Sequence, residues 1–228
     1  MARRYFTQDT FGFLSSLAAN NNRDWFNEHK QTYEDAVRTP ALHFIEDMAA
    51  ELVVISPHFS AIPKKVGGSL MRVYRDTRFG KDKRPYKTNI GIHFRHEMGK
   101  DVHAPGFYLH IAPDECFAGV GIWRPDAKAL AKIRDAIVAD GKTWLATRDD
   151  KAFKKHFHLD GDRLKNPPRG YAKDHPLIED LKWKDFIALA DLSQSDVTGN
   201  KLMLKVLDAF EAGDPLMHFL CKALAVRY

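Results

Sequence analysis

The sequence predicts an α+β fold in a single domain, with a largely antiparallel sheet of four or five strands and with N- and C-terminal helices packed on its apolar face. Apolar residues recur at helical spacing over residues 7–56 and 125–228, but they alternate with a period of two over residues 69–124. The 228 residues suit one domain built around one core. We therefore expect the middle of the chain to form the sheet and both ends to cover it.

The first 56 residues are predicted to form three helices. Thr10 is expected to cap a short first helix, and Asn22 to cap a longer second one that reaches Val37. Thr39-Pro40 has the pattern of a cap followed by proline at the first helical position, and Pro57 is expected to end the third helix.

Four strands are predicted in the middle of the chain. They cover the ranges Leu70–Tyr74, Thr88–His96, Gly106–Ala112 and Glu115–Trp123. The last two are expected to form a hairpin, and Glu97–Pro105 a turn. These later connections are too short for crossover helices, which favours antiparallel order.

Alternation divides the strand residues between two faces of the sheet. One face is aliphatic and is expected to be buried against helices; it holds Ile90, Ile92, Phe94, Phe107, Leu109 and Ile111. The other face is polar and aromatic; it collects Arg72, Tyr74, Asn89, His93, Arg95, Tyr108, His110 and Trp123. This polar face is the candidate functional surface.

The rest of the chain returns to helical periodicity around one long loop. Helices are expected from Asp126 to a stop at Gly141, and then over Thr143–Arg148, Asp150–His156, Leu177–Leu181, Ser195–Gly213 and Asp214–Val226. Asp185–Leu192 is expected to be an edge strand. Residues 159–176 contain three prolines and form the longest predicted loop, a feature that is often functional.

The basic character of the chain is concentrated in residues 72–87. This segment holds seven basic residues and two acidic ones, a local charge of +5. The whole chain holds 35 basic and 30 acidic residues, also +5, so the remainder is balanced. Such local positive charge predicts an anionic partner, because it raises the local concentration of anions. Arginine matches phosphate or carboxylate with two parallel hydrogen bonds, and lysine contributes a point charge.

Several ordered motifs extend over nearly the whole chain. The run Arg72–Lys87 is followed by Thr88-Asn89-Ile90-Gly91, and further motifs are Asn22–Phe26, Pro105–Leu109, Pro168–Tyr171 and Asp174–Leu177. Together they resemble the pattern of domain-of-unknown-function family 2461, a widespread group of conserved hypothetical proteins. In that pattern a serine follows the residue at position 79, where this chain has Gly80. The resemblance implies domain boundaries close to the chain ends and implies no activity.

His93 and His110 are the candidate catalytic residues, since a histidine on an adjoining strand face can exchange a proton near neutral pH. Hydrogen bonding to tyrosines is the alternative role for both. Two histidines without a third ligand at a diagnostic spacing predict no metal site, and no cofactor is expected. The common hydrolase elbow, Walker loop, dinucleotide and zinc-protease motifs are absent from the sequence. Whether the protein is an enzyme stays open.

The leading functional hypothesis is a cytoplasmic protein that binds an anionic, phosphate-bearing ligand on the polar sheet face beside the basic segment. The residues expected to contact it are Arg72, Tyr74, Arg75, Arg78, Lys83, Lys87, Asn89, Arg95, Tyr108 and Trp123. Asp76 is expected to orient one of the arginines. A nucleic-acid-binding module and a module that docks an acidic protein are the alternatives, since both would use the same surface. Two cysteines, expected as buried thiols, and the lack of a long apolar run favour the cytoplasm and no membrane. The oligomeric state stays open.

Overall fold

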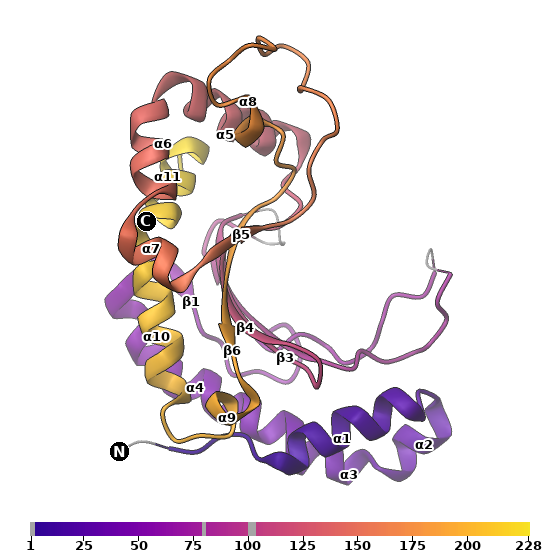
Figure 1. Ribbon diagram of the computed structural model, residues 1–228. Helices are drawn as coiled ribbons and strands as arrows, with labels where there is room; N and C mark the ends of the chain where they lie inside the picture. The colour runs from indigo at the N-terminus through magenta and orange to yellow at the C-terminus, as the bar shows by residue number, and fades with distance from the viewer. Residues whose placement is uncertain (1–2, 79–80, 100–103) are drawn as a thin grey trace.

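The computed structural model, which describes residues 3–78, 81–99 and 104–228, has the predicted α+β fold (Figure 1). Its described residues form one open sheet of six strands in the order β1-β2-β3-β4-β6-β5, and neighbouring strands are antiparallel. The strands are β1 (Phe59–Ser60), β2 (Ile90–His96), β3 (Gly106–Ile111), β4 (Cys116–Ile122), β5 (His158–Asp160) and β6 (Phe186–Leu192). Two of them, β1 and β5, were not expected from the sequence pattern.

The predicted division of the sheet into an apolar and a polar face is confirmed. All six residues assigned to the apolar face are at most 2% exposed. His93 lies opposite Tyr108 in the β2–β3 register, so no one-residue slip has exchanged the faces. Phe94 and Phe107 both contact Phe210 of a C-terminal helix, with ring centroids 5.9 and 4.7 Å from its ring.

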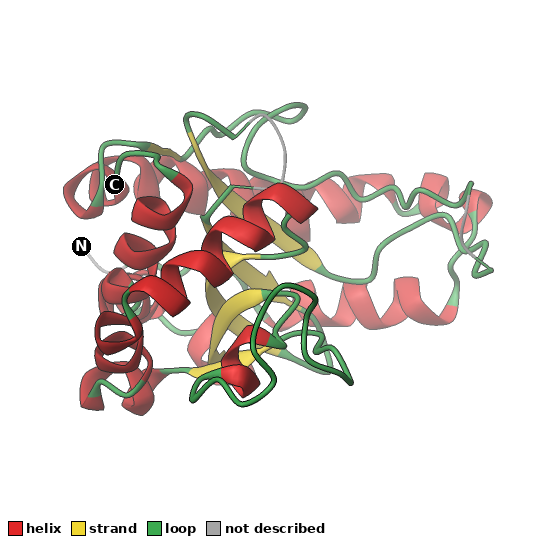
Figure 2. Cartoon of the chain, turned by 90° about the horizontal axis from the view of Figure 1, so that it is seen from above, coloured by secondary structure: helices red, strands yellow, loops and turns green. Residues whose placement is uncertain are grey.

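Helices from both ends of the chain cover the apolar face. The helix α4 (Thr39–Ile55) packs against β2, while α10 (Leu202–Ala212) and α11 (Asp214–Leu224) pack against β4. All three lie on one side of the sheet, and the N-terminal helices project away from it together with the segment that follows Leu70 (Figures 1 and 2). None of the helices in the described part of the chain combines the length and apolar composition needed to cross a membrane.

The predicted strand Leu70–Tyr74 is not a regular strand. Leu70 pairs with Ile92 on the edge of β2, but only as an isolated bridge. Beyond this point the chain leaves the sheet, and Tyr74 pairs with Tyr86 of its own returning segment. The prediction of a strand is therefore wrong beyond Leu70, because the partner of Tyr74 is another part of the same basic segment and not the sheet.

The predicted edge strand Asp185–Leu192 is a strand, β6, but it does not lie at the edge of the sheet. β5 pairs along its outer side through His158 to Asp160. β5 has three residues and β1 has two, which is too short for an alternating pattern to stand out. The turn expected at Glu97–Pro105 includes residues 100–103, which lie outside the described residues.

The N-terminal helices differ in their boundaries from those predicted. They are α1 (Gln8–Ala19), α2 (Arg23–Glu28), α3 (Lys30–Tyr33) and the π-helical segment η1 (Glu34–Arg38), which continues directly into α4. Thr7 rather than Thr10 caps α1. Asn22 caps α2 as predicted, and its side chain accepts a hydrogen bond from the Trp25 N–H at 3.0 Å. The expected long second helix is interrupted at His29, which ends α2.

The helix continues through Thr39-Pro40, where a cap was expected. Thr39 has helical backbone angles (φ −61°, ψ −48°), so it does not cap α4. A proline has no N–H, and Pro40 therefore donates no hydrogen bond to the carbonyl of Ala36, four residues earlier. The hydroxyl of Thr10 donates to that carbonyl instead, at 2.8 Å, and Thr10 is 1% exposed. Thr10 thus satisfies a buried backbone acceptor that proline leaves open.

The C-terminal helices are mostly those predicted. They are α5 (Ala127–Ala139), α6 (Gly141–Arg148), α7 (Lys151–His156), α8 (Ile178–Leu181), α9 (Gln194–Val197), α10 and α11. Asp126 caps α5 as expected, but Gly141 begins α6 instead of closing α5. The single helix predicted over Ser195–Gly213 is two helices, α9 and α10, separated by a turn at Gly199, a residue with poor helix propensity.

One buried carboxylate fixes the start of the long loop that precedes α8. Asp185 is 4% exposed, and it accepts hydrogen bonds from the N–H groups of Arg124 (2.7 Å) and Asp162 (2.9 Å). The loop predicted at residues 159–176 is present from residue 161 onwards, since residues 158–160 form β5. Asp185 therefore joins the ends of β4, β5 and β6 at one end of the sheet.

The two cysteines are buried free thiols, as predicted. Burial raises the pKa of the Cys221 thiol to about 12, because a thiolate loses its hydration there. Burial also raises the pKa of Cys116. Both groups therefore stay protonated near neutral pH and act as small apolar core residues.

Thr10→Val should destabilise the fold, because it removes both the donor to the Ala36 carbonyl and the acceptor for the Thr7 N–H while keeping the side-chain shape. We expect a loss of about 1–3 kcal/mol in the free energy of unfolding, measured by urea denaturation. Thr32→Val, on the exposed side of α3, is the matched control and should change it by less than about 0.5 kcal/mol. Equal effects of the two substitutions would contradict this role of Thr10.

Candidate functional site

The basic segment forms an arm that projects from the edge of the sheet. We call residues 71–87 the arm; the structure describes residues 71–78 and 81–87 of it. Its outgoing and returning limbs are joined by hydrogen bonds from the Arg75 N–H to the Pro85 carbonyl (2.9 Å) and from the Lys87 N–H to the Val73 carbonyl (2.7 Å). The arm extends beside the N-terminal helices, away from the helices that cover the apolar face (Figure 1).

Tyr86 anchors the arm to the N-terminal helices. Its backbone N–H donates to the side chain of Asn21 at 3.0 Å, and the Asn21 amide donates back to the Tyr86 carbonyl at 3.0 Å. The Tyr86 ring stacks on Phe26 of α2 with centroids 4.1 Å apart, and Tyr86 is 3% exposed. The position of the arm is therefore set by contacts between residues about 65 positions apart in the chain.

Two aspartates pair with three of the arm's arginines. Asp76 accepts two hydrogen bonds from the Arg78 guanidinium (3.0 and 2.7 Å), which holds the pKa of Asp76 at about 2. Asp82 accepts from Arg84 and from Arg75 (2.7 and 2.5 Å), and these bonds keep its pKa well below the usual range. Asp76 thus orients one arginine, Arg78, as expected, and Asp82 pairs with Arg75, another arginine of the predicted ligand-binding set.

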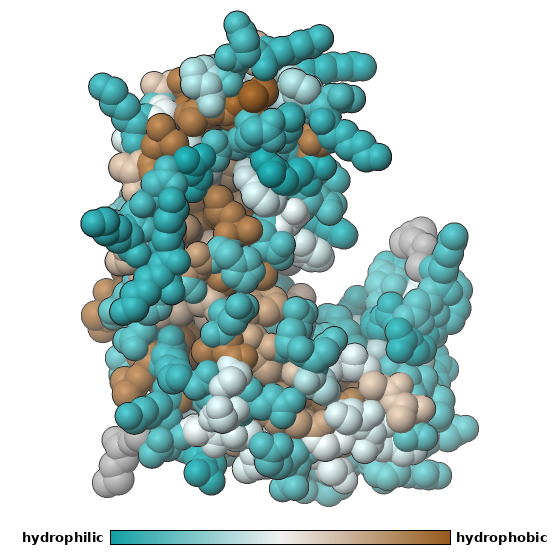
Figure 3. Space-filling view, viewed as in Figure 1, coloured by the Kyte–Doolittle hydropathy of each residue, from teal (hydrophilic) through white to brown (hydrophobic). Residues whose placement is uncertain are grey.

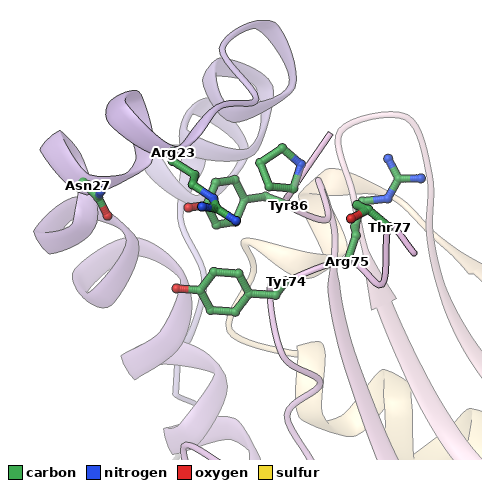
Figure 4. Close-up of a pocket in the computed structure, with 7 residues that line it drawn as sticks. Arg23, Asn27, Tyr74, Arg75, Thr77 and Tyr86 are labelled. Carbon is green, nitrogen blue, oxygen red and sulfur yellow. The ribbon is translucent and has the colours of Figure 1, made fainter. Parts of the chain in front are cut away.

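A pocket of about 330 Å³ lies between α2 and the arm (Figure 4). Arg23 and Asn27 line it from α2, and the remaining lining residues come from the two limbs of the arm: Tyr74, Arg75, Thr77, Pro85 and Tyr86. Tyr74 and Arg75 belong to the predicted ligand-binding set. Arg23 and Asn27 do not; Arg23 lies in the motif Asn22–Phe26, which was the available signal, but no local concentration of charge accompanies it.

The lining of this pocket is rich in hydrogen-bond donors and contains no carboxylate. Within the described residues, no side-chain hydrogen bond or ion pair engages Arg23, Asn27 or the hydroxyl of Tyr74, which is 54% exposed. Arg75 projects away from α2 toward Asp82, whereas Arg23 projects across the pocket near Tyr86 (Figure 4). Arg23 is therefore the cation best placed to meet a ligand there.

The polar face of the sheet brings His93, Tyr108 and His110 together. Tyr108 lies directly opposite His93, with ring centroids 6.3 Å apart, and its hydroxyl is 3.2 Å from Nδ1 of His110. The two histidines share one face as predicted, but the tyrosine stands between them. This face looks toward a wide notch, bordered by the arm on one side and by the region of α5 and α8 on the other (Figures 1 and 3).

His93 is a neutral group at neutral pH. Burial, and then the nearby Arg95 guanidinium, lower its pKa to about 4. Arg95 Nε donates to His93 Nδ1 at 3.4 Å, which leaves the proton of the neutral ring on Nε2. Nε2 lies over Gly106, where a Cβ atom would approach it to 2.4 Å. His93 therefore offers a hydrogen-bond donor on this face and does not become charged above about pH 5.

Tyr108 and His110 form a second polar contact on the same face. Burial raises the pKa of Tyr108 to about 12 and lowers the pKa of His110, so both are neutral near pH 7. The His110 ring stacks on Phe117 (4.8 Å, 3°), and its Nε2 lies 3.8 Å from the Glu115 carboxylate. The contact with Tyr108 matches the predicted alternative for His110, whereas the described partner of His93 is Arg95 and not a tyrosine. A role in proton transfer stays a prediction for both histidines.

The other predicted site residues lie apart from these two groups. Lys83 Nζ donates to the Thr77 carbonyl (2.9 Å). Lys87 and Asn89 lie against apolar residues of α1, where burial, and then the charge of Arg72, lower the pKa of Lys87. Trp123 is 49% exposed beyond the end of β4, with the Arg124 guanidinium 4.5 Å from its ring.

Gly80, where the family pattern has a serine, and the preceding Phe79 lie outside the described residues. Within residues 3–78, 81–99 and 104–228, no three His, Cys, Asp or Glu side chains are grouped as metal ligands. The predicted set is thus distributed over several places: the pocket, the outer part of the arm (Arg78 and Lys83), the region near α1 (Lys87 and Asn89), the polar face of the sheet and the end of β4.

The depressed pKa of His93 should make stability fall between about pH 6.5 and pH 4. Over this range the unfolded chain binds a proton that the folded protein excludes, so folding weakens by up to about 3 kcal/mol as the pH falls; above about pH 7 there is no effect. His93→Gln should flatten this dependence in urea denaturation at about pH 7 and pH 5, and the exposed His156→Gln should not. Equal pH dependences in the two variants would contradict a buried neutral His93.

Comparison with known proteins supports the resemblance found in the motifs. A family model described as a conserved hypothetical protein, DUF2461, matches residues 9–219. A search of curated proteins gives no match. The matched range contains the arm, α2 and the polar face of the sheet, and it extends over most of the chain. The chain therefore belongs to the DUF2461 family.

Proposed function

We propose that the protein binds a small anionic, phosphate-bearing ligand, with the pocket between α2 and the arm as its primary site. The observation that carries the proposal is the lining of this pocket, which contains two arginines, an amide and three hydroxyl groups but no acid. A site that offers donors without carboxylates favours an anion, because an acid in the wall would repel it.

The energetics suit a modest affinity. Hydrogen bonds to charged groups contribute about 1.5–3 kcal/mol each, and micromolar binding needs about 8 kcal/mol. Three or four such bonds from Arg23, Thr77 and the tyrosine hydroxyls reach that range before the cost of ordering the ligand and the side chains. The stacked ring of Tyr86 lowers that cost on the protein side, since it holds the pocket wall in place.

The pairing of charges within the arm favours a small ligand over a nucleic acid or an acidic protein. A polyanion would need cations presented along an extended surface. Asp76 and Asp82 engage Arg75, Arg78 and Arg84, so these three guanidinium groups are directed into ion pairs within the arm instead of along an extended surface. The open polar face of the sheet, with His93 and Tyr108, remains available to the part of a larger ligand that extends from the pocket.

Arg23→Gln should weaken the binding of ribose 5-phosphate or pyrophosphate at least about tenfold in isothermal titration, since it removes one charge-assisted contact. Lys81→Gln, an exposed cation nearer the outer end of the arm, is the control and should change affinity by less than about twofold.

Equal losses in the two variants would contradict the pocket as the site. Tight binding of oligonucleotides that strengthens with length and falls steeply with salt would replace the small ligand by a nucleic acid. A shallow salt dependence without length preference is the result that the proposal predicts.

A further inference from the structure

Tyr74 is an aromatic side chain placed for stacking against a ligand. Phe26 stacks on Tyr86 at 4.1 Å, and Tyr86 contacts Tyr74 at 5.3 Å with the rings tilted by 43°. The first two residues of this series are buried, whereas Tyr74 is 54% exposed and lines the pocket. One wall of the pocket is therefore an aromatic surface held in place from behind by two buried rings.

Asn27 supplies a second kind of recognition in the same pocket. It lies one helical turn from Arg23, so both side chains leave the same side of α2. Its amide carries an adjacent donor and acceptor, which is the pattern that reads the edge of a nucleobase. The described residues give the Asn27 side chain no hydrogen bond of their own.

These features follow one another across the pocket (Figure 4). Arg75 and Thr77 lie at one end and Asn27 at the other, while Arg23 and Tyr74 lie between them. The Thr77 hydroxyl thus lies at one end and the Asn27 amide at the opposite end, with the Arg23 guanidinium and the exposed ring of Tyr74 between them.

We propose that the ligand of this pocket is a nucleoside monophosphate. Its phosphate would bind Arg23 and Thr77, its base would stack on Tyr74, and Asn27 would bond the edge of the base. This inference rests on the proposed anion site and adds the requirement for a planar base. The volume of about 330 Å³ lies at the small end of ligand pockets, which fits a mononucleotide and not a longer strand.

The test compares adenosine monophosphate with ribose 5-phosphate, which keeps the sugar phosphate and lacks the base. In isothermal titration, the nucleotide should bind the wild-type protein at least about tenfold more tightly, because base stacking contributes on that scale. Tyr74→Ala should abolish this preference and Tyr74→Phe should retain it. The readout is the ratio of the two affinities within each variant, because loss of the Tyr74 hydroxyl weakens both compounds alike. Asn27→Ala should weaken binding of the nucleotide only.

Each outcome decides between the two proposals. Equal affinity of the wild type for both compounds overturns the nucleotide assignment and leaves the anion site standing. A preference that survives in Tyr74→Ala, with its fold verified by circular dichroism, also overturns the assignment. Failure of both compounds to bind at millimolar concentration overturns the anion site itself. If Tyr74→Ala does not fold, the wild type and Tyr74→Phe decide: loss of the preference in the phenylalanine variant contradicts stacking.

Discussion

Burial of a single face of the sheet is the constraint on which the rest of the structure depends. The apolar residues of β2 and β3 are at most 2% exposed, and the chain covers them with α4 from one end and with α10 and α11 from the other. Both ends are required because the sheet is wider than one helix can cover. Because the helices cover that side, His93, Tyr108 and His110 lie on the uncovered face of the sheet. This face is bordered by the arm and by the long loop.

The position of the arm depends in turn on Tyr86, which contacts α2 and also lines the pocket. Tyr86 joins the arm to α2 through two hydrogen bonds with Asn21 and a ring stack on Phe26, and it forms part of the pocket wall. Asp76 and Asp82 shape the outer part of the arm by pairing with its arginines. The same segment thus has a buried anchor, an outer part whose arginines are paired with aspartates, and a donor-lined pocket between them. In the proposed site, the cation without an acidic partner among the described residues, Arg23, therefore comes from α2 and not from the most basic stretch of the chain.

Much of the fold could be predicted from the sequence, because β2, β3 and β4 have six or seven residues each and polar side chains alternate with apolar ones in β2 and β3. The short strands β1 and β5 carry too few residues for such a pattern. Thr39-Pro40 was misread because a cap and a continuing helix share this dipeptide, and the distinction lies with Thr10, far away in the chain. The site was predicted less well because its contacts also join residues that are far apart in the chain. Local charge indicated the arm, but the contact of Asn21 with Tyr86 and the approach of Arg23 are long-range.

The central claim is that an anion binds between α2 and the arm, and amide chemical-shift mapping of the isotopically labelled protein tests it most directly. On titration with ribose 5-phosphate, the account predicts shift changes that cluster at Arg23, Asn27, residues 74–77 and Tyr86, and that need at least about tenfold more ligand in Arg23→Gln. Changes centred on His93 and Tyr108, or an absence of changes at millimolar ligand, would contradict it.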